Sequence, residues 1–179
     1  MKNTKKLFII ILCLIILVFA GCSKNTEDSA QETAKDFVMD LYTVNDIEIE
    51  NYKSLLSLNP LEAMDLYDEV QINDEVLKSL MTDNAYERML KNRENLKFTE
   101  ICYRKNYTMQ ASEIKLAELN TNTEASEAVY NFEVQINLIS GDGNESASIA
   151  KGTIELAKID NSWKVAGYRY ILPDLLRDL

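Results

Sequence analysis

The residues that precede Cys22 indicate its chemistry more clearly than the sequence does for any other residue. Three lysines lie within the first six residues, and residues 7–20 are apolar without interruption. As a helix these 14 residues span about 21 Å, whereas the hydrocarbon core of a bilayer is about 30 Å thick. The length therefore favours the apolar core of a signal peptide over a membrane-spanning helix. Two small residues, Ala20 and Gly21, stand directly before the cysteine.

The segment Phe19-Ala20-Gly21-Cys22 resembles the lipobox of bacterial lipoproteins, although Phe19 stands where leucine is usual. The resemblance implies that residues 1–21 are a signal peptide, that Cys22 is lipidated and that cleavage makes it the N-terminus. Palmitate-type acyl chains would then hold the protein to the membrane, because two chains give a stable anchor and one does not. We expect a lipidated tether over residues 22–28 and a location on the extracytoplasmic face of the cell membrane. The alternative is an uncleaved anchor with an incidental cysteine.

The other cysteines and the lack of histidine limit the chemistry of the chain. The sequence has three cysteines and no histidine. Cys13 lies in the segment expected to be removed, so the mature chain keeps Cys102 as its free thiol and forms no intramolecular disulfide. Without histidine, Ser-His-Asp and Cys-His sites are excluded, and so is the commonest transition-metal ligand. We expect Cys102 to be a buried apolar residue rather than a nucleophile.

The charge of the chain argues against nucleic acid as a partner. The formal net charge is −10. Removing the three lysines of residues 1–21 leaves 16 basic and 29 acidic residues, a charge of −13. Such a field repels phosphate backbones and anionic lipids, so it favours a neutral or basic partner, or serves solubility alone.

The first half of the mature chain has helical periodicity. Apolar residues from Ala30 to Tyr42 recur at three- and four-residue steps and predict an amphipathic helix that Asp28 or Ser29 caps. Residues 46–50 alternate in polarity and predict a break. Further short helices are expected around Tyr52–Leu56, from Asn59-Pro60 to Val70, from Asn73-Asp74 to Met81, and after Thr82 to Leu90.

The second half has the alternation of strands. The expected strands are Tyr107–Leu119, Ala128–Ile139, Ala147–Ile159 and Trp163–Ile171, with turns at residues 140–144 and 160–161. In the first strand, Met109 and Ala111 are expected on the face opposite Ile114 and Leu116. A short helix from Asp174 closes the chain. Helices followed by a meander predict an α+β domain over residues 29–179, with N-terminal helices packed on a curved antiparallel sheet of about four strands.

Three segments resemble NTF2-like (cystatin-like) domains, a fold common in small lipoproteins of Gram-positive bacteria. They are the helix ending in Asp40-Leu41-Tyr42, the stretch from Met81 to Arg93, and the closing hairpin from Gly152 to Val165. The resemblance covers about residues 29–172 and implies a cone-shaped sheet with a pocket beneath the helices. Some members are isomerases, cyclases or dehydratases that use Asp or His there. With no histidine present, no Asp-His dyad and no catalytic residue carries over.

Four groups of residues are candidate sites, and each also has a purely structural interpretation. Tyr130, Phe132, Trp163 and Tyr168 could line the ligand pocket, or form ordinary core. Asp65, Asp68 and Glu69 could hold a cation, or form a solvated helix face. Residues 142–145 offer oxygens, but a hairpin turn needs the same residue types. Tyr103 to Tyr107 mix aromatic and basic side chains and are expected to be a loop that could contact a partner. No metal or other cofactor is expected.

These observations favour a membrane-anchored extracytoplasmic lipoprotein that acts as a non-enzymatic binding or interaction module at the cell envelope. Its partners would be the membrane, through the lipid on Cys22, and an envelope protein or a small-molecule ligand. One alternative is a carboxylate-dependent enzyme, such as an isomerase or dehydratase, with an Asp or Glu buried in an apolar pocket. Another is a structural subunit of an envelope assembly.

Overall fold

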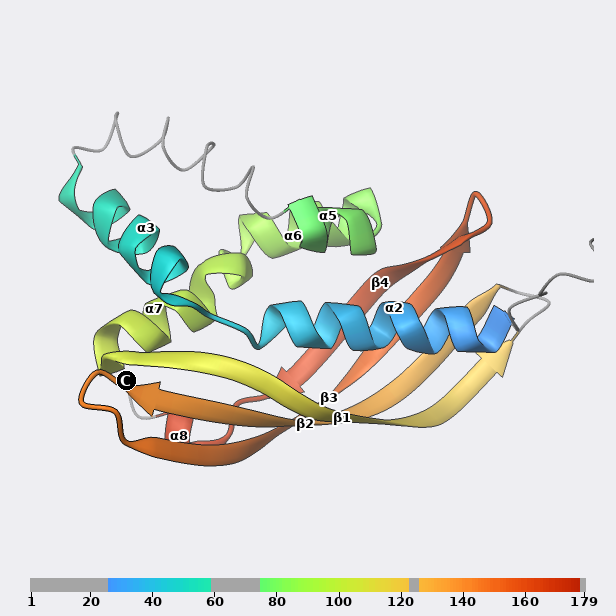
Figure 1. Cartoon of the computed structure of the whole chain (residues 1–179). Helices are drawn as coiled ribbons and strands as arrows, with labels where there is room; N and C mark the ends of the chain where they lie inside the picture. The colour runs from blue at the N-terminus through green and yellow to red at the C-terminus, as the bar shows by residue number, and fades with distance from the viewer. Residues whose placement is uncertain (1–25, 59–74, 123–125, 178–179) are drawn as a thin grey trace, which may run out of the picture.

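The computed structural model describes residues 26–58, 75–122 and 126–177. The strands β1 (Tyr107–Asn122), β2 (Glu127–Ser140), β3 (Glu145–Ile159) and β4 (Ser162–Ile171) form one antiparallel sheet in the order β1-β2-β3-β4. The helices α2 (Thr26–Leu41), α3 (Asp46–Ser57), α5 (Glu75–Leu80), α6 (Asp83–Lys91) and α7 (Lys97–Lys105) lie over one face of the sheet (Figure 1). A 3-10 turn, η1 (Glu94–Leu96), links α6 to α7, and α8 (Asp174–Arg177) follows the sheet. The predicted α+β class is confirmed.

Helix α2 lies lengthwise across the sheet (Figure 1) and carries the apolar stripe expected from the sequence. The residues of the stripe are all nearly or fully buried: Ala30, Ala34, Phe37, Val38, Leu41 and Tyr42. The helix begins at Thr26, earlier than the capping residues Asp28 and Ser29 had suggested. Residues 26–28 therefore belong to the helix and not to the expected tether.

The short helices begin at side-chain caps. Asn45 accepts hydrogen bonds from the backbone N–H groups of Ile47 and Glu48, while the Glu48 carboxylate accepts from the Asn45 N–H. This capping box starts α3 at Asp46, so the expected break over residues 46–50 is wrong. Residues 82–84 were expected to interrupt the preceding helix and cap the next turn, and the cap is Thr82, whose hydroxyl lies 3.2 Å from the Ala85 nitrogen at the start of α6. The expected helix over residues 59–70 and the start at Asn73-Asp74 lie outside the described residues.

Helix α7 was not predicted from the sequence. Residues 103–105, which had been expected to form a loop, are its last turn. Phe98, Ile101 and Cys102 are buried in one cluster with α2 and the sheet. The helix ends at Asn106, whose left-handed conformation (φ 56°) turns the chain directly into β1.

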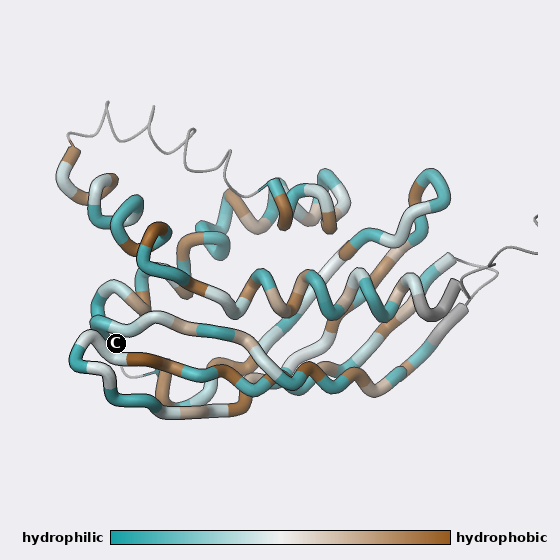
Figure 2. The backbone as a smooth tube through the Cα atoms, in the orientation of Figure 1, coloured by the Kyte–Doolittle hydropathy of each residue, from teal (hydrophilic) through white to brown (hydrophobic). Residues whose placement is uncertain are grey.

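Strands β2 and β3 form the centre of the sheet. The predicted alternation of β2 is confirmed, with every second residue buried beneath the helices: Ala128, Tyr130, Phe132, Val134, Ile136 and Leu138. Figure 2 shows hydrophobic and hydrophilic residues alternating along the strands. This pattern assigns one face of the sheet to the core and the other to solvent.

Both edge strands contain a β-bulge at which the inward-facing set changes from odd to even residue numbers. In β1 the register shifts at Glu113, which has a φ of 41°, so Met109 and Ala111 share the core face with Ile114 and Leu116. The expectation that the two pairs lie on opposite faces is therefore wrong, because a bulge adds one residue to the strand.

In β4 the shift falls at Ala166. The inward residues before it are Trp163 and Val165, and those after it are Tyr168 and Tyr170. Bulges increase the local twist, so this shift and those in β1 help to curve the sheet around the helices.

Connecting segments cover part of each sheet edge. Val44 pairs with Met109 of β1 through two backbone hydrogen bonds of 2.7 and 2.9 Å. On the other edge Met81 forms a parallel bridge with Val165, and the Thr82 nitrogen donates to the Val165 carbonyl at 2.9 Å. These contacts fix α2 and α6 against the sheet and satisfy edge groups that would otherwise be open.

We expect Gly152→Ala to lower the free energy of unfolding by about 1–3 kcal/mol, because the added carbon overpacks the core. A Cβ at position 152 would overlap the backbone carbonyl oxygen of Arg169 on β4 and lie 2.6 Å from ring atoms of Phe132, which pairs with Gly152. Urea denaturation measures the effect. Gly143→Ala is the control, since no atom lies within 4 Å and the cost comes only from φ 84°. Equal losses in the two variants would contradict this account.

Candidate functional site

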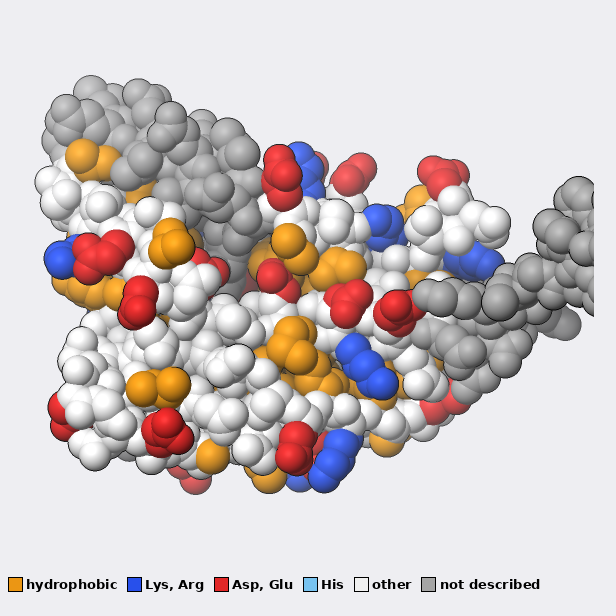
Figure 3. All heavy atoms as spheres, viewed as in Figure 1, with side chains coloured by type: hydrophobic (Ala, Val, Ile, Leu, Met, Phe, Trp, Pro, Cys, Tyr) orange, Lys and Arg blue, Asp and Glu red, His pale blue; other side chains and the backbone are white. Residues whose placement is uncertain are grey.

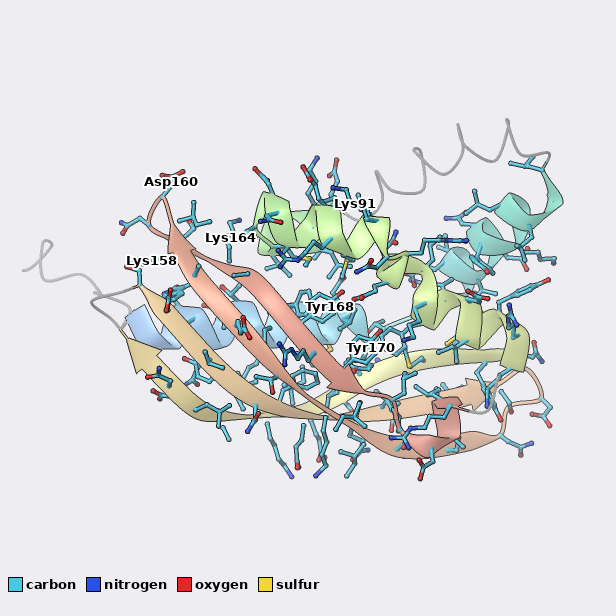
Figure 4. All side chains as sticks on the ribbon, turned by 180° about the vertical axis from the view of Figure 1, so that it is seen from behind. Lys91, Lys158, Asp160, Lys164, Tyr168 and Tyr170 are labelled. Atoms are coloured by element: carbon cyan, nitrogen blue, oxygen red, sulfur yellow. The ribbon has the colours of Figure 1, made fainter. Side chains whose placement is uncertain are left out.

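Aromatic rings fill the space between the helices and the sheet. Tyr42, directly after α2, lies 4.7 Å from Phe98 of α7, 6.1 Å from Phe132 of β2 and 6.4 Å from Tyr170 of β4, measured between ring centroids. Phe37 lies 5.0 Å from Tyr168, which stacks on Tyr170. Figure 4 shows Tyr168 and Tyr170 along β4, facing the helices. The region in which a cone-shaped fold would hold a pocket is packed with these rings.

The four residues predicted to line a pocket separate into two groups. Tyr130, Phe132 and Trp163 are at most 5% exposed and belong to the core cluster. Tyr168 is half-buried and lines a cavity at the margin of the core. The alternation in β2 and β4 indicated that the first three face inward, but sequence spacing does not reveal which inward residue reaches an opening.

The cavity at Tyr168, here named the Glu94 cavity, has a volume of about 300 Å³ and lies between α6, η1 and β4. The Tyr168 hydroxyl donates to the Glu94 carboxylate at 2.5 Å. Burial, and then this bond, raises the pKa of the Tyr168 phenol. Arg88 donates to the Ala166 carbonyl at 2.7 Å and to Asn84 at 3.0 Å. These polar groups of the cavity already bind one another.

Two more tyrosines, Tyr170 and Tyr42, belong to the same group of rings as Tyr168. Burial raises the pKa of Tyr170, against the lowering effect of Lys97, whose ammonium group lies 5.1 Å from the ring centroid. Burial also raises the pKa of Tyr42, and the nearby Tyr170 raises it further. The Tyr42 hydroxyl is fully buried and has no hydrogen-bond partner among the described residues.

A larger cavity, here named the α3 cleft, has a volume of about 560 Å³. It lies between α3, the end of α7 and the adjoining ends of β1 and β2. Its lining combines aromatic, apolar and charged side chains: Tyr103, Tyr107, Ile49, Ile139, Asp46, Glu50 and Lys53. The turn at Asn106 places Tyr103 at the end of α7 and Tyr107 at the start of β1, so both reach this cleft.

Contacts between α7 and the β2–β3 turn shape the α3 cleft. The Gly141 nitrogen donates to the Asn106 carbonyl at 2.9 Å, and a Cβ at Gly141 would overlap the Asn106 side chain. Cys102 lies at the base of the cleft and is 1% exposed. Burial raises the pKa of its thiol to about 12, with a smaller contribution from Glu48. The predicted partner-contact residues Tyr103 and Tyr107 are thus brought together with residues of α3 that the sequence did not single out.

The acidic candidates for a cation site do not form one in the described part of the chain. Asp142 accepts hydrogen bonds from Ser140 and from Asn144 within its own turn, and these bonds lower the pKa of its carboxyl. Asp65, Asp68 and Glu69 lie outside the described residues. Across residues 26–58, 75–122 and 126–177 no group of three potential ligands could hold a metal ion.

The described helices and the charges of one face bear on the question of membrane and nucleic-acid contacts. Among the described helices, none combines the length and hydrophobicity that crossing a bilayer requires. Figure 3 shows acidic and basic side chains interspersed over the face that carries α2.

No protein-family model matches the chain, and no curated protein matches its sequence. Three solved structures are similar in arrangement. The intermembrane space region of the chloroplast protein ARC6 is 10% identical, with 54% of this chain and 76% of that chain covered and a TM-score of 0.37. A periplasmic fragment of TraM is 10% identical, with 80% of this chain and 96% of that chain covered and a TM-score of 0.42. A putative calcium/calmodulin dependent protein kinase II association domain from Xanthomonas campestris is 17% identical, with 46% of this chain and 56% of that chain covered and a TM-score of 0.31. With TM-scores below 0.5, these likenesses carry no argument about function.

We expect Tyr168→Phe to lower stability and Tyr42→Phe not to lower it. Tyr168→Phe removes a bond to a carboxylate and should lower the free energy of unfolding by about 1–2 kcal/mol. Tyr42→Phe removes a buried hydroxyl without a partner and should leave the free energy unchanged or raise it. Chemical denaturation of the two variants measures both. A loss in Tyr42→Phe as large as in Tyr168→Phe would show that the Tyr42 hydroxyl is bonded.

The raised pKa of Cys102 predicts a loss of stability at alkaline pH. The thiol ionises near pH 8.5 in an unfolded chain and near 12 in the folded protein. The contribution of the neutral thiol to the free energy of unfolding is therefore complete below about pH 8.5 and is lost as the pH rises toward 12. Cys102→Ala should lose less stability than wild type between about pH 8.5 and 10 in urea denaturation. The same slope in both proteins would contradict the burial of the thiol.

Proposed function

We propose that this chain is a lipoprotein held at the extracytoplasmic face of the cell membrane by a lipid on Cys22, and that its NTF2-like domain binds a partner rather than catalysing a reaction. The observation that carries the proposal is a segment in which three lysines are followed by the fourteen apolar residues 7–20 and then by Gly21-Cys22. Among the described residues the first helix, α2, begins at Thr26, so the domain would follow its anchor almost directly.

The α3 cleft supports the binding function. Tyr103 is 37% exposed, and its ring lies 5.6 Å from that of the buried Tyr52, which holds it in place. Exposed but pre-positioned tyrosines beside apolar side chains are typical of the centre of protein interfaces. With a net charge of −13 expected for the mature chain, a neutral or basic envelope protein or small ligand is the favoured occupant.

The Glu94 cavity is the observation that favours an enzyme as the second candidate. Glu94 and Tyr168 place a carboxylate beside a phenol hydroxyl, as a proton-transferring site requires. Two facts weigh against this function. The carboxylate is engaged by Tyr168, and Asp40, whose carboxyl pKa is raised by burial, lies outside the linings of the Glu94 cavity and the α3 cleft. A structural subunit of an envelope assembly is a further alternative, which the same interaction experiments address.

Cys22→Ser tests the anchor. In the wild type, labelled palmitate should enter the protein and the protein should partition into detergent, because the acyl chains are attached at Cys22. Cys22→Ser should lose the label and remain at the size of the unprocessed chain. Cys13→Ser, within the segment expected to be removed, is the matched control and should behave as wild type. Label retained in Cys22→Ser would show that Cys22 is not the lipidated residue.

Tyr103→Ala tests the binding site. The wild-type protein is used to isolate proteins from detergent-solubilised membranes of its own source, and their affinity for each variant is measured. Tyr103→Ala should weaken binding about tenfold or more, as the loss of an interface hot spot does. Glu94→Gln is the control that leaves the α3 cleft intact. Loss of binding in Glu94→Gln but not in Tyr103→Ala would assign the function to the Glu94 cavity.

A further inference from the structure

The distance between the proposed anchor and the domain restricts how the domain can sit at the membrane. Three residues separate Cys22 from Thr26, the first residue of α2. Even fully extended, the four steps of chain reach at most about 14 Å. Helix α2 has 16 residues and is therefore about 24 Å long. The end at which α2 begins therefore stays within about 14 Å of the bilayer, whereas the far end of the helix can lie further away.

That end also contains the tips of the strands. Figure 1 shows the start of α2 beside the last residues of β1 and the first residues of β2, with the β3–β4 turn at the same end of the molecule. In Figure 4, Lys158 and Asp160 lie at this end. The Lys158 nitrogen donates to the Ser126 carbonyl at 2.8 Å, which ties the end of β3 to the start of β2.

Two large apolar side chains are exposed on these tips. Leu119 is 57% exposed and lies at the second bulge of β1, where the register shifts between Glu118 and Asn120. Ile159, the last residue of β3, is 44% exposed. Neither belongs to the core cluster. Leu119 is the extra residue of this bulge and has no partner in the register with β2.

We propose that Leu119 and Ile159 contact the bilayer and set the orientation of the domain on it. The inference rests on the proposed lipidation of Cys22 and adds the surface that touches the lipid. Apolar side chains at such a surface enter the boundary between headgroups and acyl chains. Acidic Glu118, Glu127 and Asp160 are mixed with basic Lys158 and Lys164 at this end, and such a mixed surface fits a zwitterionic lipid better than an anionic one.

This orientation directs the α3 cleft away from the membrane. The cleft is lined by the β2–β3 turn and the end of α7, which lie at the opposite end of the sheet from the start of α2 (Figure 1). A partner in the extracytoplasmic space would therefore reach Tyr103 without displacing lipid.

The test places an environment-sensitive fluorophore on cysteines introduced one at a time into the full-length, acylated protein. Leu119→Cys and Ile159→Cys are the test positions. Ile149→Cys and Ile171→Cys are matched controls, because these residues are 55% and 62% exposed and lie toward the other end of the sheet, where both line a cavity with α8. The proteins are reconstituted in phosphatidylcholine vesicles that contain lipids with nitroxide quenchers.

Quenching at positions 119 and 159 should exceed that at positions 149 and 171 by about twofold or more, because the bound depth is about 5–10 Å. Equal quenching at all four positions, or stronger quenching at 149 and 171, would overturn the orientation. Mass spectrometry of Cys22 in the same preparations separates the two proposals. An unacylated Cys22 would refute the anchor, whereas an acylated protein without quenching at 119 and 159 would refute only the lipid-contacting surface.

Discussion

The burial of one helix against the concave face of a four-stranded sheet is the constraint on which the rest of this structure depends. The apolar stripe from Ala30 to Tyr42 is almost completely removed from water. Tyr42, directly after the helix, contacts rings from α7, β2 and β4 and so joins the helical layer to the sheet. Because interiors pack at crystal-like density, this arrangement leaves little room beneath the helices. The Glu94 cavity and the α3 cleft accordingly lie at the margins of the core.

The β-bulges make this packing possible. A regular strand of the length of β1 would direct half of its apolar residues toward solvent, since side chains alternate strictly. The extra residue at Glu113 returns Ile114 and Leu116 to the core, and the one at Ala166 does the same for Tyr168 and Tyr170. The bulge at Ala166 in β4 therefore also positions Tyr168 for its bond with Glu94, and the Ala166 carbonyl accepts a hydrogen bond from Arg88. The bulges therefore contribute to the curvature of the sheet, to the packing of the core and to the geometry of the Glu94 cavity.

The filled interior bears on function. An enzyme of the proposed alternative class needs a carboxylate in a dry, open pocket, whereas here the central space is aromatic and the carboxylate at its margin is hydrogen-bonded. The α3 cleft instead presents positioned tyrosines to solvent. Together with the short span between Cys22 and Thr26, this arrangement agrees with the proposed module, of which one end would lie at the lipid and the other would be available to a partner.

The residue pattern alone determined the class of the fold, because hydrophobic periods of three to four and of two residues reflect which face each element buries. It was sufficient for the stripe of α2, the alternation of β2 and the cap at Thr82, all of which depend on neighbours in sequence. The lipobox is likewise a local pattern, and it remains a prediction. Tertiary structure decided the rest. The bulges, the helix α7 and the grouping of Tyr103 with Tyr107 arise from contacts between segments distant in sequence, such as Gly141 with Asn106, and no local period encodes such contacts. For the same reason only the folded chain distinguished Tyr168, at an opening, from Tyr130 in the core.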